Sequence, residues 1–377
     1  MKRCGILTIN VSLMNYGNRL QNYALQEVIK SLGFEVETVN YTPIYPAQTT
    51  VSPSPQLTFY QRIKRKLRGR KNMSIWQRLN NRYKYRRKIC EYREFKNKRI
   101  MWSKERLTYG DDLRVLAAKY DYVICGSDQV WNPYWEGTQP IYFMEFIPQE
   151  RRIAYAVSFG VSDIPENMKE MYRVAIESIP HLSCREARGV ELIRSLTGKE
   201  AKQVLDPTLM LDRGQWENIE DRFSAVKSGE DYILAYFLGK MDEGAEEVMI
   251  SFAQTNNCRT IYLDKWEYKD NAFASPTEFL YLVHHARLIV TDSFHGIVFS
   301  IIYNRPFVYV PRSLELGQAQ DMSSRMDSLL RLFKLEGRAI DKLSAEDWEW
   351  LDYTEVNMIW QKEKESSMKF LRSALGV

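Results

Sequence analysis

Short apolar runs alternate along this chain with segments of helical periodicity, and each run ends in small or polar residues. Residues 5–10 form the first run, residues 20–32 carry apolar side chains at helical spacing, and residues 34–41 form the next run. This order predicts a strand, a helix and a second strand, the unit from which parallel sheets are built. The carboxyl ends of parallel strands meet at one edge, where open α/β sheets bind their ligands.

The alternation breaks once, which divides the chain into two α/β domains. Apolar runs with polar ends recur up to residue 184, and a second series begins at residue 232. A chain of 377 residues is also too long for one ordinary hydrophobic core. The predicted divisions are an N-terminal domain over 1–215, a C-terminal domain over 216–354, and a last helix over 355–377 that packs back on the first domain.

Composition and motif content exclude several classes of protein. No run of about 18 or more apolar residues exists, and the first apolar run is too short for a signal peptide, so we expect a cytoplasmic protein. The 5 cysteines form no CxxC pair and the 4 histidines lack HExxH spacing, so a protein-held metal is not expected. The absence of GxGxxG, GxxxxGK[ST] and GxSxG argues against dinucleotide-binding, P-loop and serine-hydrolase classes.

A strongly basic stretch lies between residues 62 and 106. It holds 19 Lys and Arg against 3 Asp and Glu, interleaved with aromatic residues, and the rest of the chain is net acidic. We predict a basic helical arm over 60–106 that projects from the first domain. Two interpretations stay open, a solvated helical face and a surface that contacts an anionic lipid or a diphosphate-bearing substrate. Nucleic acid is not expected as a partner, because no RNP, helix-turn-helix or zinc-finger pattern accompanies the charge.

The segment 291–296 (TDSFHG) joins an apolar run to an apolar helical segment, which predicts a strand, a tight turn and a buried helix. The first turn of a helix offers unpaired N–H groups and a partial positive charge to an anion. His295 in that turn can hold a phosphate and move a proton near neutral pH. A structural alternative stays open, in which Asp292 or Ser293 caps the helix and His295 is only half buried. Asp292 can equally orient His295.

Six strand ends carry short polar segments in a characteristic order along the chain. Taken together, these segments resemble the polysaccharide pyruvyl transferase family. The resemblance runs from about residue 5 to about residue 335 and leaves out the basic arm. The segments are 15–22 (NYGNRLQN), 126–132 (GSDQVWN), 158–160 (SFG), 183–186 (SCRE), 206–207 (DP) and 292–296 (DSFHG).

The resemblance implies an α/β fold with two doubly wound, Rossmann-like domains facing a cleft, as in GT-B enzymes. It also implies a transferase that moves the pyruvyl group of phosphoenolpyruvate onto two hydroxyls of a sugar in a cell-surface polysaccharide precursor. The products are a cyclic ketal and phosphate, and phosphoenolpyruvate is a co-substrate, with no cofactor or metal. The expected partners are phosphoenolpyruvate, a saccharide acceptor that can be lipid-linked, and the inner membrane face through residues 62–106.

The donor site is expected to take most of its residues from the second half of the chain. His295 matches the histidine of the family, which would hold the phosphate and deliver a proton to the methylene carbon. Arg185, at a strand end, can fork onto a carboxylate or phosphate, although a structural ion pair or helix cap is the alternative. The family often has a basic residue two positions before its histidine, where this chain has Ser293. We expect Ser293 and Gly296 to contact the donor, and Arg325 to supply the missing charge.

The acceptor site is expected in the first domain. Asp128 is the first candidate for the base that deprotonates a sugar hydroxyl, with a cap of the turn after its strand as the structural alternative. Asp206 and Pro207 are expected to form a turn at the domain junction. The predicted acceptor-binding residues are Asn18, Arg19, Gln21, Gln129 and Trp131, because amide, guanidinium and indole groups commonly grip sugars.

Two other functions stay open from the sequence. A GT-B glycosyltransferase that uses a nucleotide sugar would share the fold, although the acidic pair with a glycine-rich loop expected for a nucleotide diphosphate is absent. A non-catalytic basic scaffold would dock biosynthetic partners or anionic lipid through residues 62–106.

Overall fold

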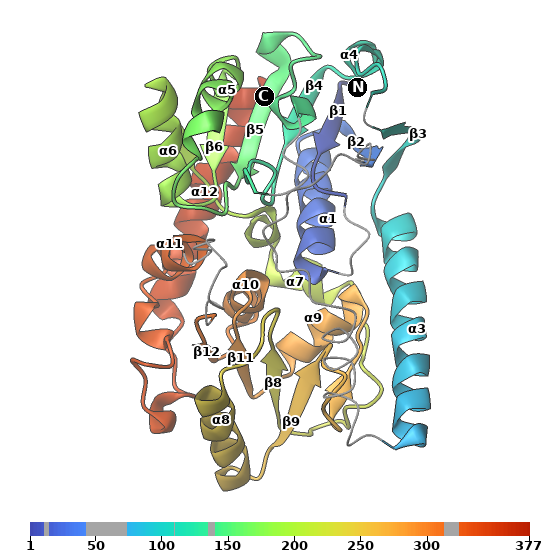
Figure 1. Cartoon of the computed structure of the whole chain (residues 1–377), viewed down its shortest axis with the longest axis vertical. Helices are drawn as coiled ribbons and strands as arrows, with labels where there is room; N and C mark the ends of the chain where they lie inside the picture. The colour runs from blue at the N-terminus through green and yellow to red at the C-terminus, as the bar shows by residue number, and fades with distance from the viewer. Residues whose placement is uncertain (11–14, 43–73, 109, 135–139, 313–323) are drawn as a thin grey trace.

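Two parallel β-sheets, each packed with helices, form the two halves of the molecule (Figure 1). The computed structural model describes residues 1–10, 15–42, 74–108, 110–134, 140–312 and 324–377. Both halves therefore have the architecture predicted from the alternating pattern, and the α/β fold with two Rossmann-like, GT-B-like domains is confirmed.

The first sheet contains seven parallel strands in the order β3-β2-β1-β4-β5-β6-β7. Its strands are β1 (Arg3–Leu7), β2 (Glu35–Thr42), β3 (Trp102–Thr108), β4 (Tyr122–Cys125), β5 (Arg152–Val157), β6 (His181–Cys184) and β7 (Lys202–Gln203). Its helices are α1 (Tyr16–Ser31), α3 (Ile75–Arg99), α4 (Arg114–Lys119), α5 (Glu166–Glu177) and α6 (Ala187–Thr197), and the short 3-10 helix η3 (Pro207–Met210) follows β7.

The second sheet contains five parallel strands in the order β10-β9-β8-β11-β12. Its strands are β8 (Tyr232–Tyr236), β9 (Arg259–Leu263), β10 (Asn271–Ala272), β11 (Leu288–Thr291) and β12 (Phe307–Tyr309). The helices of this half are α7 (Arg213–Glu217), α8 (Glu243–Thr255), α9 (Pro276–His284), α10 (Phe294–Tyr303) and α11 (Ser324–Leu332), and α12 (Thr354–Leu375) ends the chain.

Helix α1 begins at Tyr16 rather than at the predicted residue 20. The cause is Asn15, whose side chain accepts a hydrogen bond of 3.1 Å from the backbone N–H of Asn18 and so caps the helix. The first turn of α1 therefore includes the polar segment that the sequence interpretation had placed in a loop.

The last helix, α12, lies against the first domain. Trp360 Nε1 donates a hydrogen bond of 2.7 Å to the Leu209 carbonyl, and Ser367 Oγ accepts one of 2.9 Å from the Leu205 N–H. Leu371 on the same helix is fully buried. Among the helices that the structure describes, none combines the length and the apolar character needed to cross a membrane.

The predicted basic helical arm over 60–106 is helical over part of its length, in α3 (Ile75–Arg99), but its last residues are not helical. Helix α3 ends at Arg99, and the residues after it form β3, which pairs with β2 at the edge of the first sheet. Residues 43–73 lie outside the described part of the chain. Helix α3 runs alongside the second domain instead of projecting from the first (Figure 1).

Two basic side chains of α3 hold the second domain, which explains the position of the helix. Arg87 donates two hydrogen bonds to the carboxylate of Glu278, at 2.8 and 3.1 Å. Lys88 is buried, pairs with Asp264, and lies 4.6 Å from the ring centre of Tyr16. Burial lowers the pKa of Lys88 and raises the pKa of Asp264, so the pair forms at a cost in desolvation.

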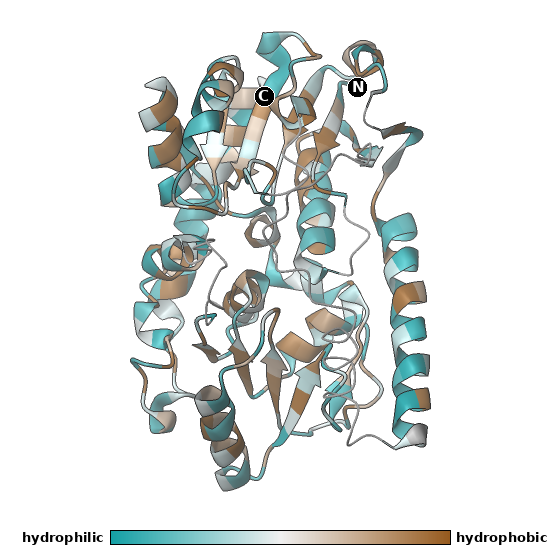
Figure 2. Cartoon of the chain, in the orientation of Figure 1, coloured by the Kyte–Doolittle hydropathy of each residue, from teal (hydrophilic) through white to brown (hydrophobic). Residues whose placement is uncertain are grey.

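A continuous apolar core crosses between the two halves next to this ion pair. The Tyr16 ring stacks on Phe279 at 4.5 Å and meets Tyr236 edge-on at 5.7 Å. Its hydroxyl donates a hydrogen bond of 3.1 Å to the Ala274 carbonyl. The strands of the second sheet that face this region are largely hydrophobic (Figure 2). The start of α1 is therefore anchored in the core of the other domain.

We expect Lys88→Met to lower the stability of the protein by about 2 kcal/mol, because the substitution leaves the partly buried Asp264 without its partner. The double variant Lys88→Met/Asp264→Leu should recover most of that loss, since no unpaired charge remains. Thermal and urea unfolding of the two variants would measure the difference. Equal unfolding midpoints for the single and double variants would show that the charge pair does not hold α3 in place.

Candidate active site

Two helix N-termini, one from each domain, meet between the sheets. Helix α1 follows β1 and helix α10 follows β11, so both begin at the carboxyl ends of parallel strands. A Cβ atom added at Gly17 in α1 would lie 1.9 Å from Nδ1 of His295 in α10. Only a glycine fits there, because of this contact between domains. The N-termini of α1 and α10 both carry partial positive charge, so the position where they meet favours an anion.

His295 is mostly buried at this junction, with 11% of its side chain exposed. Its Nε2 atom lies 3.8 Å from Oδ1 of Asp206, which is beyond hydrogen-bond range. No described residue hydrogen-bonds to that nitrogen. His295 therefore carries a buried ring nitrogen without a hydrogen-bond partner among the described residues, next to a carboxylate that can neutralise the imidazolium.

Asp206 is a candidate functional residue that the sequence interpretation had assigned only to a turn. It caps η3 through the Thr208 N–H at 3.0 Å, as expected for a turn, but its other oxygen accepts hydrogen bonds from Ser127 at 3.1 Å and from Arg185 at 2.9 Å. Burial alone would raise the pKa of Asp206, yet His295, Arg185 and the Thr208 N–H together hold it well below its usual range. The carboxylate of Asp206 therefore stays negatively charged beside Arg185 and His295.

Arg185 is buried, and only part of its guanidinium group has a hydrogen-bond partner among the described residues. Its Nη1 atom bonds to Asp206, whereas Nε and Nη2 have no hydrogen-bond partner among the described residues. The guanidinium lies 4.4 Å from the ring centre of Phe294, the first residue of α10. Burial by itself lowers the pKa of Arg185, but the carboxylates of Asp206, Glu186 and Asp128 raise it overall. Nη1 of Arg185 therefore forms the ion pair of the structural interpretation, whereas its donor-binding role stays a prediction.

Arg325 of α11 adds a second guanidinium near the first. Burial, followed by the positive charge of Arg185, lowers the pKa of Arg325 to about 10. Its Nε atom has no hydrogen-bond partner among the described residues. Two cations held close together with unused donors would each gain from a shared anion. This position is compatible with the predicted role of Arg325 as a source of charge.

The turn before α10 uses Ser293 and Gly296 for its own structure. Ser293 Oγ accepts a hydrogen bond of 3.4 Å from the Gly296 N–H, and a Cβ atom at Gly296 would lie 2.6 Å from Thr291 Oγ1. The predicted donor contacts of Ser293 and Gly296 are therefore corrected, because both are buried and these groups are already occupied.

Asp292 neither orients His295 nor caps α10. Its carboxylate accepts hydrogen bonds from the Leu238 and Gly239 N–H groups at 2.7 and 2.8 Å, and from Arg312 Nε at 2.8 Å. Asp292 thus ties the loop after β8 to the end of β12, and the helix cap is Ser293.

Asp128 and Asn18 lie together at the strand ends of the first domain. Asn18 Nδ2 donates to Asp128 Oδ2 at 3.0 Å and to the Ile9 carbonyl at 2.9 Å. Asp128 Oδ1 also accepts a hydrogen bond of 2.9 Å from the Gln129 N–H, so Asp128 does shape the turn after β4. Its carboxylate is nevertheless half buried and close enough to Arg185 to raise the pKa of that guanidinium.

Three of the predicted acceptor-binding side chains belong to the core instead. The Trp131 ring is fully buried between Phe143 and Phe159, so neither face can meet a sugar. Most residues of the loop after β4 are buried, which the polar sequence of residues 126–132 did not indicate. Gln21 is fully buried and donates to Thr8 at 3.0 Å, and Gln129 accepts from Asn132 at 2.9 Å.

Arg19 is 6% exposed, and burial lowers the pKa of its guanidinium. Its backbone N–H donates a hydrogen bond of 3.4 Å to the Asn15 carbonyl within the capped first turn of α1. Of the predicted acceptor set, Asn18 is the residue that the structure places beside Asp128.

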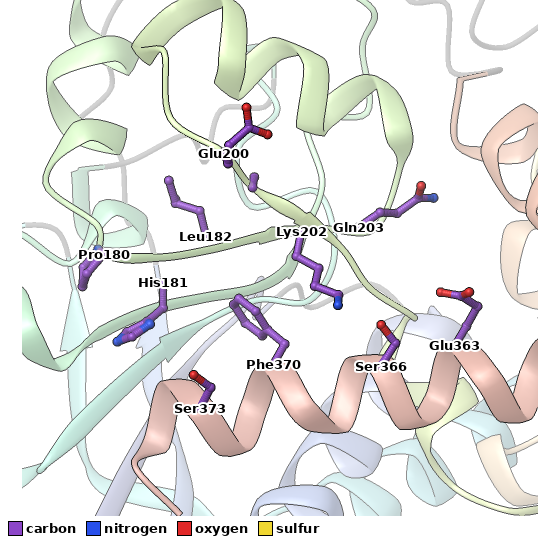
Figure 3. Close-up of a pocket in the computed structure, with 11 residues that line it drawn as sticks. Pro180, His181, Leu182, Glu200, Lys202, Gln203, Glu363, Ser366, Phe370 and Ser373 are labelled. Carbon is purple, nitrogen blue, oxygen red and sulfur yellow. The ribbon is translucent and has the colours of Figure 1, made fainter.

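A separate cavity of about 530 Å³ lies between α12 and the strands β6 and β7 (Figure 3). Its lining includes His181, Lys202 and Gln203 of β6 and β7 and Glu363 and Phe370 of α12. None of the residues lining the cavity carries a buried polar atom without a partner. The junction of α1 and α10 is therefore the stronger candidate for chemistry.

The fold and this junction define a two-domain, GT-B-like α/β protein with cationic side chains where its halves meet, some of whose nitrogens have no hydrogen-bond partner among the described residues. The sequence profile described as polysaccharide pyruvyl transferase matches residues 15–313. The chain belongs to this family of transferases. The matched range contains Gly17, Asp128, Arg185, Asp206 and His295, and Arg325 lies beyond it.

Several solved structures are similar in overall shape at low identity. A UDP-GlcNAc 2-epimerase from Neisseria meningitidis bound to UDP-GlcNAc has 10% identity and a TM-score of 0.48, covering 99% of this chain and 100% of the other. HepE from Anabaena, in complex with UDP and glucose, has 8% identity and a TM-score of 0.49, covering 100% of both chains. The E. coli ADP-heptose LPS heptosyltransferase II has 12% identity and a TM-score of 0.36, covering 97% of this chain and 100% of its own. A comparison with curated proteins gives no match.

Replacing Gly17 with alanine should disrupt the junction, because the new methyl group would overlap the His295 imidazole. We expect Gly17→Ala to cost about 1–3 kcal/mol of stability through overpacking and to displace His295. Gly214→Ala is the matched control, since a Cβ atom there meets nothing within 4 Å. Differential scanning fluorimetry of both variants gives the comparison, and equal melting temperatures would contradict the contact.

Proposed function

We propose that this protein transfers the pyruvyl group of phosphoenolpyruvate to two hydroxyls of a sugar in a cell-surface polysaccharide precursor. The observation that carries the proposal is the set of unpaired nitrogens at the domain junction, Nε and Nη2 of Arg185 and Nε2 of His295. Phosphoenolpyruvate carries a carboxylate and a phosphate, so it needs several cationic donors in one place.

The donor would bind with its two anionic groups shared between the cations. Arg185 can fork onto one group with its two unused nitrogens, and Arg325 can approach the same ligand from α11. The N-termini of α1 and α10 add partial positive charge from the two sides. His295 Nε2 is the group placed to hold and then move a proton.

In the proposed reaction, a sugar hydroxyl attacks the central carbon of phosphoenolpyruvate and passes its proton to Asp128. His295 Nε2 delivers a proton to the methylene carbon, which becomes a methyl group. The second hydroxyl then attacks the same carbon, the bond to phosphate breaks, and the departing phosphate takes the second hydroxyl proton. Asp206, 3.8 Å from Nε2, would balance the charge of the imidazolium before transfer. Asn18 would hold Asp128 in position.

His295→Ala should abolish stabilisation by phosphoenolpyruvate and reduce phosphate release by about 10²-fold or more, because it removes the proton donor. Arg185→Lys should keep the positive charge but lose the paired donors that bind a carboxylate or phosphate in bidentate fashion. The variant should therefore raise KM for phosphoenolpyruvate more than it lowers kcat. Thermal-shift titrations with phosphoenolpyruvate, and phosphate release in the presence of saccharide acceptors, measure both effects. His181→Asn, a half-buried histidine on β6, is the matched control.

Two outcomes of these assays would overturn the proposal. One is stabilisation of the wild-type protein by a UDP-, GDP- or CMP-sugar with no response to phosphoenolpyruvate, which would favour glycosyl transfer. The other is phosphate release by His295→Ala at the wild-type rate.

We also propose that the outer face of α3 contacts an anionic lipid surface, where a lipid-linked acceptor would lie. Trp76, Leu79 and Tyr83 are 81%, 54% and 70% exposed, and their spacing of three and four residues places them on one face. Arg82 and Arg86 are exposed on the same helix. An exposed apolar stripe flanked by arginines is typical of helices that lie in the lipid interface.

The triple variant Trp76→Ala/Leu79→Ser/Tyr83→Ser should lose binding to vesicles that contain phosphatidylglycerol, because it removes the apolar part of the face. Trp350→Ala is the control, since Trp350 is 74% exposed elsewhere on the surface. Vesicle co-sedimentation with phosphatidylcholine alone tests the charge dependence. Equal sedimentation of the triple variant and the wild-type protein would contradict this surface.

A further inference from the structure

Two histidines and two glutamates meet on the second domain, away from the junction of α1 and α10. His284 ends α9 and His285 follows it, whereas Glu217 ends α7 and Glu220 lies just beyond. Helix α9 leads from β10 to the start of β11, so its last turn lies at the amino ends of the strands. Ligand groups at this end of the sheet play no part in the proposed transfer reaction.

The side chains approach one another closely. Glu220 Oε2 lies 3.0 Å from His284 Nδ1, and Glu220 Oε1 lies 3.3 Å from His285 Nε2. One ligand atom from each of these three residues fits within 4.8 Å of the other two. The other nitrogen of His284, Nε2, lies 3.6 Å from Glu217 Oε1.

These distances match the spacing of ligands around a small cation. Zinc bonds to nitrogen and oxygen are about 2.1 Å long, and tetrahedral angles then place neighbouring ligand atoms about 3.4 Å apart. The two measured glutamate–histidine separations, 3.0 and 3.3 Å, are close to that value. Two imidazoles and one carboxylate also form a ligand set that zinc sites use, with a fourth position open to water.

The surroundings hold both imidazole rings in place. The His284 ring stacks on Tyr303 at 4.4 Å and 11°, and the His285 ring lies over Tyr281 at 4.2 Å. The carboxyl end of α9 carries a partial negative charge, which favours a cation.

We propose that Glu220, His284 and His285 bind one divalent cation of the zinc class, a site that the sequence pattern had not led us to expect. Glu217 Oε1 lies 3.6 Å from Nε2 of His284, the ring nitrogen that faces away from Glu220, so its negative charge lies next to that ring. The bound metal links Glu220, in the segment between α7 and β8, to His284 and His285 at the end of α9. Its role is structural, and it fixes the segment between α7 and β8.

Isothermal titration of tag-free, chelator-treated protein with ZnCl2 tests the site. We expect one Zn²⁺ per chain, a rise in melting temperature with Zn²⁺, and no rise with Mg²⁺, which prefers oxygen ligands. His285→Gln should weaken Zn²⁺ binding by more than about tenfold, because it removes a direct ligand. His285 is 41% exposed, so this variant should fold normally.

Three controls keep the outcome independent of the proposed transfer reaction. His181→Gln removes a distant histidine and should bind Zn²⁺ like the wild-type protein. Co²⁺ in place of Zn²⁺ should give the visible absorption of a tetrahedral site, which His285→Gln should lose. The proposal is overturned if the wild-type protein shows no saturable Zn²⁺ binding, or if Glu220→Gln and His285→Gln both bind Zn²⁺ with unchanged affinity. The pair of histidines would then serve only as ion-pair partners of Glu220.

Discussion

The candidate active site depends on the buried carboxylate of Asp206. This group bonds to Ser127 and Arg185 from the ends of two strands and lies 3.8 Å from His295 of the other domain. A buried charge is tolerated only when it is paired and hydrogen-bonded, so these neighbours cannot move independently. Arg185 bonds to Asp206 through Nη1. Its other donors, Nε and Nη2, have no partner among the described residues, and the guanidinium lies against Phe294 at the start of α10.

The contact between domains has a second support in helix α3. One face of this helix places Lys88 and Arg87 against acidic groups of the second domain, next to Tyr16 in the shared core. The same residues that looked like a free basic arm therefore hold the two halves together beside the site. The other face remains exposed, and this division of one helix between two partners accounts for its mixed basic and aromatic sequence.

Much of the fold and part of the site could be predicted from the sequence. Hydrophobic periodicity is local, so most strands and helices were predicted in the correct order, but the edge strands β3 and β10 were missed. The rule that parallel strands end at one edge directed attention to Asp128, Arg185 and His295, which do lie at strand ends, and their functional roles stay predictions. It failed for Trp131, because a polar segment after a strand can still turn back into the core.

Periodicity and the order of polar strand ends thus determined the two-domain α/β architecture and the family resemblance, since both are written in neighbouring residues. Only the tertiary structure decided which of those polar side chains keep atoms without a hydrogen-bond partner and which form helix caps or core contacts. It also brought Gly17 to His295, and Glu220 to His284, across long stretches of chain. The physical reason is that such distances follow from how separate elements pack, which no local pattern of residues encodes.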